Sequence, residues 1–280
     1  MNQPQLDVTA SIVLYQNNSE VVRKTVESFL KTNLRKTLYL IDNSPTDNLR
    51  SLRLSNTSVI EYIKNDKNIG FGKAHNIAFD LSLKMNAKYH VVLNPDVYFN
   101  EGTIELLFNY AEANPEVGLL SPKILYPDGS LQPLCKLLPT PADLFIRRFL
   151  SSTRISDQKT KIYELHDSKY DKIMNIPYLS GCFMFLRNSV LREIGYFDDR
   201  IFMYIEDADL TRRIYQKYKT LYFPQATIWH GYQKGSYKNL KLMLYNIHGA
   251  FVYFTKWGWF FDKQRREINK DVKKNYLKPS

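Results

Sequence analysis

Three carboxylates stand within four residues, at Glu206, Asp207 and Asp209. They follow the apolar run IFMYI and open a segment with helical spacing, where the helix dipole favours acids and Asp209 can pair with an arginine one turn further on. A helix start explains only part of the cluster. The apolar run before it would be buried in the core, so the carboxylates that follow it would lie outside the core, at a cleft. Crowded acids also raise one another's pKa, which suits a general base. The cluster predicts an acid–base site, with a dipole-stabilised helix start as the alternative.

A second candidate site is the sequence Asn94, Pro95 and Asp96, which follows the hydrophobic segment VVL and places a carboxylate at a predicted strand end. A carboxylate in that place can ligate Mg²⁺ or Mn²⁺, hard cations that prefer oxygen ligands and bridge to diphosphate oxygens. Asn and Asp also form turns and cap helices, so the same residues can be a simple turn. The residues alone leave both interpretations open.

Glycine is absent before Gly70. The first strand-to-helix turn is therefore neither a GxGxxG dinucleotide fingerprint nor a Walker A phosphate loop. The same absence argues against the sugar nucleotidyltransferases, whose Gly-rich loop follows their first strand. Open α/β sheets bind ligands beyond the carboxyl ends of their strands. A nucleotide would thus be held by the polar residues that close the strands, namely Asp42, Asn94 and Asp96.

Strand-like and helix-like segments alternate along the chain. The expected strands are 8–15, 37–42, 59–64, 89–93 and 178–186. The expected helices are 18–31, 73–85, 100–114, 189–194 and 206–218. This alternation predicts an α/β fold with a mostly parallel central sheet flanked by helices.

Four further expectations concern local structure. Asn100 is expected to cap the helix that follows it. Pro127, Asp128 and Gly129 mark a turn between two strand-like runs. Residues 139–176 show no clear hydrophobic period and are rich in charge. This predicts a flexible loop, close to where an acceptor substrate would bind. The segments TLYFP and ATIWH predict two further strands.

The charge of the chain is concentrated at one end. Its 280 residues carry a net charge of +11, of which residues 231–280 hold +8, and 44% of the residues are hydrophobic. A surplus of this kind favours a phosphorylated substrate, a nucleic acid or a membrane surface. The tail FVYFTKWGWFFDKQRREINKDVKKNY interleaves aromatic and basic residues, which suits a lipid interface or base stacking. A solvated basic helix that packs its aromatics on the domain is the alternative.

The compartment is predicted from what the sequence lacks. The start MNQPQLDVTA has no signal-peptide pattern, and the longest uncharged apolar stretch in the tail, 242–255, is too short to span a bilayer. Cys135 and Cys182 are too few for a disulfide framework. We therefore expect a cytoplasmic protein, with a peripheral position at the inner face of the cell membrane if the tail binds lipid.

The order of several motifs resembles family 2 glycosyltransferases of the GT-A fold, in particular their rhamnosyltransferase-like branch. These motifs are SIVLY, YLIDNSPTD, NIGFGKAHNIA, VVLNPDV, YLSGCFMFLRNSVLREIGYFDDRIFMYIEDADLTRRI and WHGYQKGS. The resemblance covers roughly residues 8–236. It implies a GT-A domain over 1–236, with a nucleotide-binding half at about 1–122 and an acceptor-side half at about 123–236. A basic helical tail follows over 237–280.

For donor binding, the resemblance implies the residues Tyr15, Asp42, Asn76 and Asn94. Asp42 would end the second strand beside the nucleotide base. The same aspartate could instead begin the turn that follows it.

For the metal and the base, the resemblance places Asp96 at the metal-ligating position of the DXD motif, whose first acid is Asn94 here. His230 would be a further ligand for Mg²⁺ or Mn²⁺, or else a structural histidine. The glutamate–aspartate pair of the family falls on Glu206 and Asp207, with Asp207 as the base.

The function that this resemblance implies is inverting transfer of a sugar, rhamnose first among the candidates, from a dTDP- or UDP-linked donor to a glycan or lipid-linked acceptor. A catalytically silent protein that binds nucleotide sugars or glycans is one alternative. A nucleic-acid-binding protein that uses the basic tail is another, but it leaves the carboxylate cluster without a purpose, so no nucleic-acid partner is expected.

Overall fold

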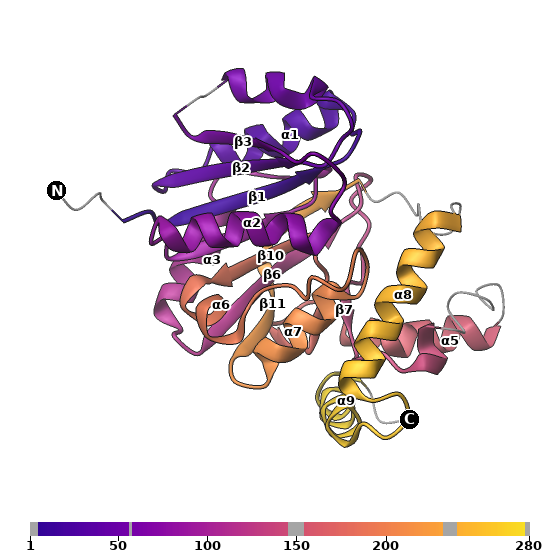
Figure 1. Ribbon diagram of the computed structural model, residues 1–280. Coiled ribbons are helices and arrows are strands. Elements are labelled where there is room, and N and C mark those ends of the chain that lie inside the picture. The colour runs from indigo at the N-terminus through magenta and orange to yellow at the C-terminus, as the bar shows by residue number, and fades with distance from the viewer. Residues whose placement is uncertain (1–4, 56–57, 145–153, 232–239, 278–280) are drawn as a thin grey trace.

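The structure is a computed structural model that describes residues 5–55, 58–144, 154–231 and 240–277. Within these residues the centre is a nine-stranded sheet in the order β3-β2-β1-β4-β10-β6-β11-β5, with β8 paired to β11 (Figure 1). Its strands are β1 (Val8–Leu14), β2 (Lys36–Asp42), β3 (Ile60–Lys64), β4 (Tyr89–Leu93), β5 (Val97–Phe99), β6 (Val117–Leu125), β8 (Met174–Asn175), β10 (Phe183–Arg187) and β11 (Lys219–His230). A separate pair consists of β7 (Cys135–Lys136) and β9 (Tyr178–Leu179).

The strand directions bring the ends of distant strands to one edge of the sheet. β1 is parallel to β2 and β4, and β2 is parallel to β3. β10 is antiparallel to both β4 and β6, so β6 and its parallel neighbour β11 point the same way as β4. The carboxyl ends of β1, β2, β4 and β11 therefore share one edge. The predicted α/β fold with a central sheet flanked by helices is confirmed, but the sheet is mixed, because β10, β5 and β8 run antiparallel to their neighbours.

Helices cover both faces of the sheet. They are α1 (Ser19–Leu30), α2 (Phe71–Lys84), α3 (Thr103–Ala113), α5 (Arg154–Tyr163), α6 (Asn188–Ile194), α7 (Glu206–Tyr215), α8 (Leu240–Trp257) and α9 (Lys263–Tyr276), with short 3₁₀ helices at Asn48–Ser55 and His166–Ser168. α2, α6 and α7 lie on one face, α1 and α3 lie on the other, and α8 and α9 pack beside α7 (Figure 1).

β4 shows why a strand in this sheet is apolar throughout. All five of its residues are buried, with Val91 and Leu93 in the core under α1 and α3 and Val92 in the core under α2, α6 and α7. A strand that is covered on both faces gives a continuous apolar run in the sequence. The polar residues that follow it, from Asn94 onward, therefore emerge at the sheet edge.

The expected strand 178–186 is wrong as a single element. Residues 178–179 pair with β7 as β9, and residues 183–187 join the central sheet as β10. The break lies at Gly181 and Cys182, where the Gly181 N–H donates to the Asp207 carboxylate at 2.8 Å and the Cys182 carbonyl accepts from the Asn94 N–H at 2.9 Å. These two bonds turn the chain between the sheets.

Two other local expectations also need correction. Asn100 does not cap α3, because the helix begins after Gly102, which has the left-handed φ of 83°. Glycine adopts such a φ without the penalty that a Cβ imposes. The expected loop 139–176 is not irregular throughout, since α5, the 3₁₀ turn at His166–Ser168 and β8 lie in its described part.

The remaining strand predictions are confirmed with changes. TLYFP and ATIWH form one strand, β11, whose register against β6 shifts between Phe223 and Thr227. The turn around Gly129 is present, but the run after it makes only a single bridge, between Leu125 and Leu131, among the described residues.

The tail helices are anchored to the domain by a buried ion pair. The guanidinium of Arg212 in α7 donates to both carboxylate oxygens of Asp262 at 2.7 and 2.9 Å, and the two side chains are 1% and 3% exposed. The ring of Trp257 lies 4.0 Å from the Arg212 guanidinium. Tyr253 and Phe254 are buried in the same core cluster as the inner residues of α7. Part of the aromatic tail therefore packs on the domain.

Asp262→Ala is expected to lower the free energy of unfolding by about 3–5 kcal/mol, because it removes the carboxylate that pairs with the buried Arg212 guanidinium. Burial raises the pKa of Asp262, but the bonds from Arg212 and Arg265 outweigh it and leave that pKa below its usual value. The stabilisation is thus complete above about pH 4 and is lost as the pH falls through the lowered pKa. Urea unfolding at neutral and acid pH measures both effects. Asp271→Ala, on the exposed side of α9, is the control, and an equal loss there would contradict the assignment.

No helix among the described residues is both long enough and apolar enough to span a membrane.

Candidate active site

The edge at which the parallel strands end carries an aspartate–histidine pair. Asp96 follows β4. His230 is the last residue of β11 and pairs with Val97 of the neighbouring strand β5. The His230 Nε2 atom lies 3.4 Å from an Asp96 carboxylate oxygen and 3.2 Å from the Asn94 side-chain nitrogen. The Gly231 N–H also donates to the Asp96 carbonyl at 3.0 Å. The two predicted metal ligands, Asp96 and His230, are therefore neighbours. Asn94, which the sequence predicts to bind the sugar donor, is in contact with His230.

Gln132 fixes the orientation of His230. Its side-chain NH₂ donates to the His230 carbonyl at 2.7 Å, so its Oε1 atom faces His230 Nδ1 at 3.0 Å. A carbonyl oxygen accepts but cannot donate, so His230 Nδ1 carries a proton. The second ring nitrogen, Nε2, is then the one that faces Asp96. This is the arrangement in which an outer hydrogen bond prepares a histidine for metal binding.

The charge on His230 depends on its neighbours. Burial disfavours a charged ring, but Cys182 and Asp96 outweigh it and raise the pKa of His230 to about 10. A metal ion would bind the ring through a deprotonated Nε2, so metal binding at this atom competes with a proton.

The donor set at this edge fits a divalent cation that also has ligands from a substrate. No group of three His, Cys, Asp or Glu side chains in the described parts of the chain could hold a metal by itself. Asp96 and His230 supply one oxygen and one nitrogen, which leaves the other coordination positions for diphosphate oxygens and water.

Asp207 is the partly exposed member of the carboxylate cluster. One of its oxygens accepts from the Gly181 N–H at 2.8 Å and the other accepts from the Ala208 N–H at 2.9 Å. Because Gly181 is followed by Cys182, whose carbonyl binds the Asn94 N–H, one short segment connects Asp207 with the end of β4. The carboxylate cluster and the aspartate–histidine pair thus belong to one site.

Glu206 has a different environment from Asp207. It is buried, and its Oε2 atom has no hydrogen-bond partner among the described residues. Burial first, and then the charge of Asp207, raise the pKa of Glu206 well above its ordinary value. The environment therefore favours the neutral form of Glu206, while the Asp207 side chain accepts two backbone hydrogen bonds. The predicted rise in pKa is present at Glu206.

Asp209 has a structural role. Arg213 Nε and Lys256 Nζ donate to it at 2.9 Å, and Trp257 Nε1 donates at 2.8 Å. Its side chain is completely buried. The predicted pairing of Asp209 with an arginine one turn away is confirmed for Arg213, and these contacts separate Asp209 from its two acidic neighbours.

The backbone that leads into the acidic pair is held in an unfavourable conformation. Tyr204 and Ile205 have left-handed φ angles of 70° and 67°, which a β-branched residue rarely adopts. Gly249 of α8 packs against this segment, and a Cβ on Gly249 would lie 2.8 Å from the Tyr204 carbonyl oxygen. Such backbone strain persists where surrounding structure enforces it, often at functional sites. Here α8 enforces it directly before Glu206.

The predicted donor residues have separate surroundings. Asp42 is fully buried at the end of β2, where it accepts from the Ser44 N–H at 2.8 Å and from the Tyr62 hydroxyl. Tyr15 follows β1 with 47% of its surface exposed. Asn76 bonds to the backbone of Phe197 at both its oxygen and its nitrogen, so it braces α2 against the segment after α6. A role for these residues in donor binding stays a prediction.

Several residues of this edge were not predicted from the sequence. Asn43 binds Asn65 and Asn68 at 2.8 and 3.2 Å and joins the end of β2 to the turn after β3. The signal that could have found them is the cluster of amides after both strands. Gln132 gave no such signal, because its partner His230 lies 98 residues further along the chain.

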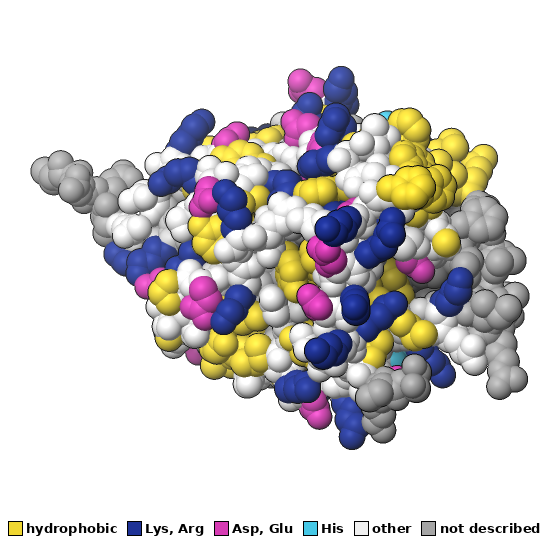
Figure 2. All heavy atoms as spheres, turned by 90° about the horizontal axis from the view of Figure 1, so that it is seen from below, with side chains coloured by type: hydrophobic (Ala, Val, Ile, Leu, Met, Phe, Trp, Pro, Cys, Tyr) yellow, Lys and Arg dark blue, Asp and Glu magenta, His cyan; other side chains and the backbone are white. Residues whose placement is uncertain are grey.

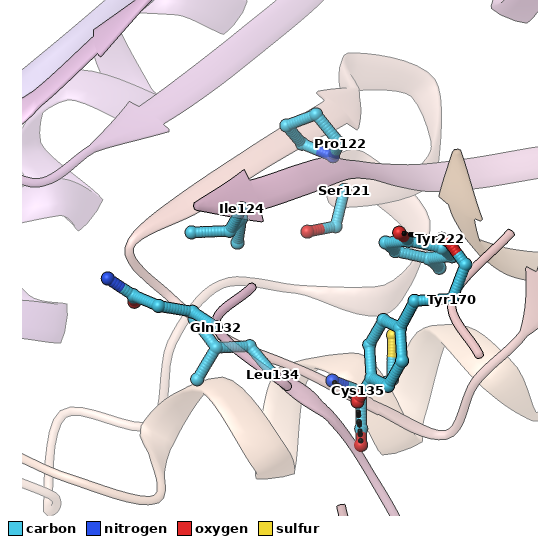
Figure 3. Close-up of a pocket in the computed structure, with 8 residues that line it drawn as sticks. All are labelled: Ser121, Pro122, Ile124, Gln132, Leu134, Cys135, Tyr170 and Tyr222. Carbon is cyan, nitrogen blue, oxygen red and sulfur yellow. Dashed lines mark hydrogen bonds between the residues drawn. The ribbon is translucent and has the colours of Figure 1, made fainter. Parts of the chain in front are cut away.

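A pocket behind Gln132 belongs to the core. Figure 3 shows Ser121, Pro122, Ile124, Gln132, Leu134, Cys135, Tyr170 and Tyr222 around it. The Tyr170 hydroxyl lies 3.1 Å from the Cys135 nitrogen and 3.2 Å from its carbonyl oxygen. The enclosed space does not admit a water molecule. Gln132 is one of the residues that line this pocket, and the pocket has no room for a sugar donor.

Comparisons with known proteins agree with this geometry. The family model Glycosyl transferase family 2 matches residues 11–195. The chain is also similar to N-acetylglucosaminyl-diphospho-decaprenol L-rhamnosyltransferase of Mycobacterium tuberculosis, with 27% identity over 227 residues that cover 78% of this chain and 74% of that protein.

Two solved structures share the fold. The mannosyltransferase PcManGT from Pyrobaculum calidifontis, in complex with GDP-Man and Mn²⁺, has a TM-score of 0.58 and 15% identity over 84% of this chain and 62% of its own. GalNAc-T7 with UDP, GalNAc and Mn²⁺ has a TM-score of 0.61 and 15% identity over 99% of this chain and 56% of its own. The chain thus spans less than two thirds of either protein. Together with the strand order, this likeness confirms the predicted GT-A fold.

Proposed function

The chain belongs to glycosyl transferase family 2, and from this membership we propose that it transfers a sugar from a nucleoside diphosphate donor to a hydroxyl group of a lipid-linked or surface glycan, with inversion at the anomeric carbon. The observation that carries the proposal is the connection between the Asp207 carboxylate and the end of β4 through Gly181 and Cys182. It gives one site both an acid–base group and a place for the diphosphate.

Asp207 acts as the general base in this proposal. Its carboxylate takes the proton from the acceptor hydroxyl as the oxygen attacks the anomeric carbon. The bond between that carbon and the diphosphate oxygen breaks, and the diphosphate leaves with the electron pair. A single displacement of this kind inverts the anomeric configuration and needs no covalent intermediate.

Glu206 keeps the charge of the site low. Burial and the neighbouring Asp207 favour the neutral form of Glu206, so the proposal gives the proton-accepting role to Asp207 and not to Glu206. The two backbone N–H groups that bind Asp207 fix the direction in which it accepts a proton.

Asp96 and His230 would hold a divalent cation, and Gln132 would keep His230 in the ligating orientation. A bound cation offsets the negative charge that develops on the departing diphosphate. The proposal is supported by the donor set at this edge and by the Mn²⁺ in the two structures with a similar fold.

The proposed acceptor is based on the similar protein from Mycobacterium tuberculosis. The name of the Mycobacterium tuberculosis protein describes transfer of L-rhamnose to a sugar on a lipid diphosphate. We propose the same class of reaction here, with a dTDP-linked 6-deoxyhexose as donor and a lipid-linked glycan as acceptor, at the cytoplasmic face of a membrane. A transfer assay with dTDP-rhamnose and a lipid diphosphate-linked N-acetylglucosamine tests it, and absence of product with every donor and acceptor tried would refute the proposal.

The nucleotide base is open to a direct measurement. We expect titration calorimetry in the presence of Mn²⁺ to show that dTDP binds more tightly than UDP or GDP, and that it raises the thermal unfolding temperature. At about 100 times its dissociation constant a ligand stabilises a protein by about 2.7 kcal/mol. Tighter binding of UDP would transfer the assignment to a UDP-sugar and leave the glycosyltransferase proposal in place.

A further inference from the structure

The outer side of the tail helices exposes a set of large apolar side chains. Leu240, Leu244, Ile247 and Phe251 recur along α8 and are 50–69% exposed, while Phe260 and Phe261 in the turn before α9 are 71% and 91% exposed. We name these six residues the apolar face. Scattered single apolar residues on a surface are ordinary, but a contiguous patch of this kind marks an interaction site.

The opposite side of the same helices is fixed to the domain. Gly249 packs against Tyr204, and the rings of Tyr245 and Phe202 lie 4.1 Å apart. The buried pair of Arg212 and Asp262 holds the start of α9. The apolar face therefore cannot turn inward without breaking these contacts.

The basic residues of the tail border this face. The outer residues of α9 are exposed and mostly cationic, namely Lys263, Arg266, Lys270, Lys273 and Lys274, against Glu267 and Asp271. Arg266 Nη2 donates to the Phe260 carbonyl at 3.4 Å, and Lys263 follows Phe261 by two positions, so cations stand beside the exposed rings. Figure 2 shows hydrophobic side chains gathered at its upper right, on the right-hand side of the molecule where Figure 1 also has α8, with Lys and Arg side chains next to them.

We propose that the apolar face rests on a lipid bilayer with anionic headgroups. Leucine, isoleucine and phenylalanine on one side of a helix, with lysine and arginine at the border, are the pattern of a helix that lies in the plane of a membrane interface. The aromatic rings of Phe260 and Phe261 enter the headgroup boundary, and the cations of α9 contact the anionic lipids.

This surface differs from the one that the sequence predicts. Trp257 belongs to the aromatic stretch that suits a lipid interface, but it donates to Asp209 and packs on Arg212, partly buried against the domain. Leu240, Leu244 and Ile247 precede the segment that the sequence singled out, yet all three are exposed on α8.

Docking in this way places the membrane close to the carboxylate pair. The inner side of α8 contacts residues 201–205, which lead directly into Glu206 and Asp207. An α-helix with its side chains is about 10–12 Å across, so the bilayer surface lies about one helix diameter from that segment. The inference rests on the proposed function only in giving the docking a purpose, which is delivery of a lipid-linked acceptor.

The test uses the full chain and two kinds of vesicle, phosphatidylcholine alone and phosphatidylcholine mixed with phosphatidylglycerol. We expect co-sedimentation with the mixed vesicles, weakened by salt because exposed charges are screened. Phe260→Ser with Phe261→Ser should lower the apparent affinity by about tenfold or more. The matched control is Val21→Ser with Leu106→Ser, which changes two apolar residues that are 42% and 41% exposed on α1 and α3 and should leave binding unchanged.

A second pair of variants tests the charge. Lys263→Gln with Arg266→Gln and Lys270→Gln should weaken binding to the mixed vesicles severalfold. The same loss of charge on α1 and at its C-cap, in Arg23→Gln with Lys24→Gln and Lys31→Gln, should have little effect. Unchanged unfolding temperatures and unchanged nucleotide binding show that each variant is folded.

Three results would overturn the proposal. The wild-type chain could remain in the supernatant with both kinds of vesicle, or the control variants could lose as much binding as the variants of the apolar face. Light scattering could also show a dimer that becomes a monomer in the Phe260→Ser, Phe261→Ser variant, in which case a second copy of the chain covers this face. If the wild-type chain binds no nucleotide, the proposed function is refuted, and the result with vesicles is unaffected.

Discussion

Asp207→Asn is expected to lower kcat for sugar transfer by about 10²–10⁴, with little change in donor affinity. The amide has nearly the same shape as the carboxylate and can still accept from one of the two backbone N–H groups, at Gly181 and Ala208. It cannot take a proton from the acceptor hydroxyl. Steady-state transfer kinetics together with calorimetry of donor binding separate the two effects.

Glu206→Gln is the control for that experiment, because burial raises the pKa of Glu206 well above its ordinary value and favours its neutral form. Replacing that form by an amide of similar shape should leave most of the turnover. If Glu206→Gln loses turnover while Asp207→Asn keeps it, the base is Glu206 and the division of roles between the two acids is reversed.

Asp209→Asn distinguishes a catalytic from a structural acid in the same cluster. Its contacts with Arg213, Lys256 and Trp257 lie inside the protein, so we expect a lower unfolding temperature and a kcat per folded molecule close to that of the wild type. The three carboxylates that the sequence groups together therefore give three different outcomes.

The sequence predicted the parts of this site that depend on local pattern. A run such as VVL followed by Asn94, Pro95 and Asp96 identifies a buried strand and a polar end, because coverage of both faces makes the whole strand apolar. The position of Glu206 and Asp207 at a helix start followed in the same way from an apolar run that gives way to acids. Both observations need only neighbouring residues.

The parts that the sequence did not predict depend on partners far away in the chain. The break at Gly181 exists because its N–H meets a carboxylate 26 residues later. Which tail aromatics face the protein was decided by Asp209 and Arg212, which bind Trp257 and leave Phe260 and Phe261 outside. A hydrophobic pattern identifies apolar residues, but it does not show which of them have a buried polar partner.

Removal of divalent cations is expected to stop transfer, and Asp96→Ala is expected to weaken donor binding in the presence of Mn²⁺ by about 100-fold or more. Asn94 stands where the DXD motif has its first acid, and among the described residues Asp96 supplies the carboxylate that lies beside His230. Calorimetry with the nucleoside diphosphate at several Mn²⁺ concentrations, with and without EDTA, measures the dependence. Undiminished turnover in excess EDTA would remove the metal from the mechanism and make Asp96 a turn residue.

Gln132→Leu tests the same site without touching a ligand. The substitution removes the bond that holds the proton on His230 Nδ1, and loss of such an outer bond lowers metal affinity by about 10–100-fold. The effect should appear as a higher Mn²⁺ requirement, with turnover recovered at saturating Mn²⁺, because the reacting groups are unchanged. The control is Gln216→Leu, since Gln216 bonds only to Gln264 on the surface in the described structure. An equal Mn²⁺ requirement in the Gln132 variant and the wild type would mean that His230 is held by the sheet alone and that Gln132 has no part in metal binding.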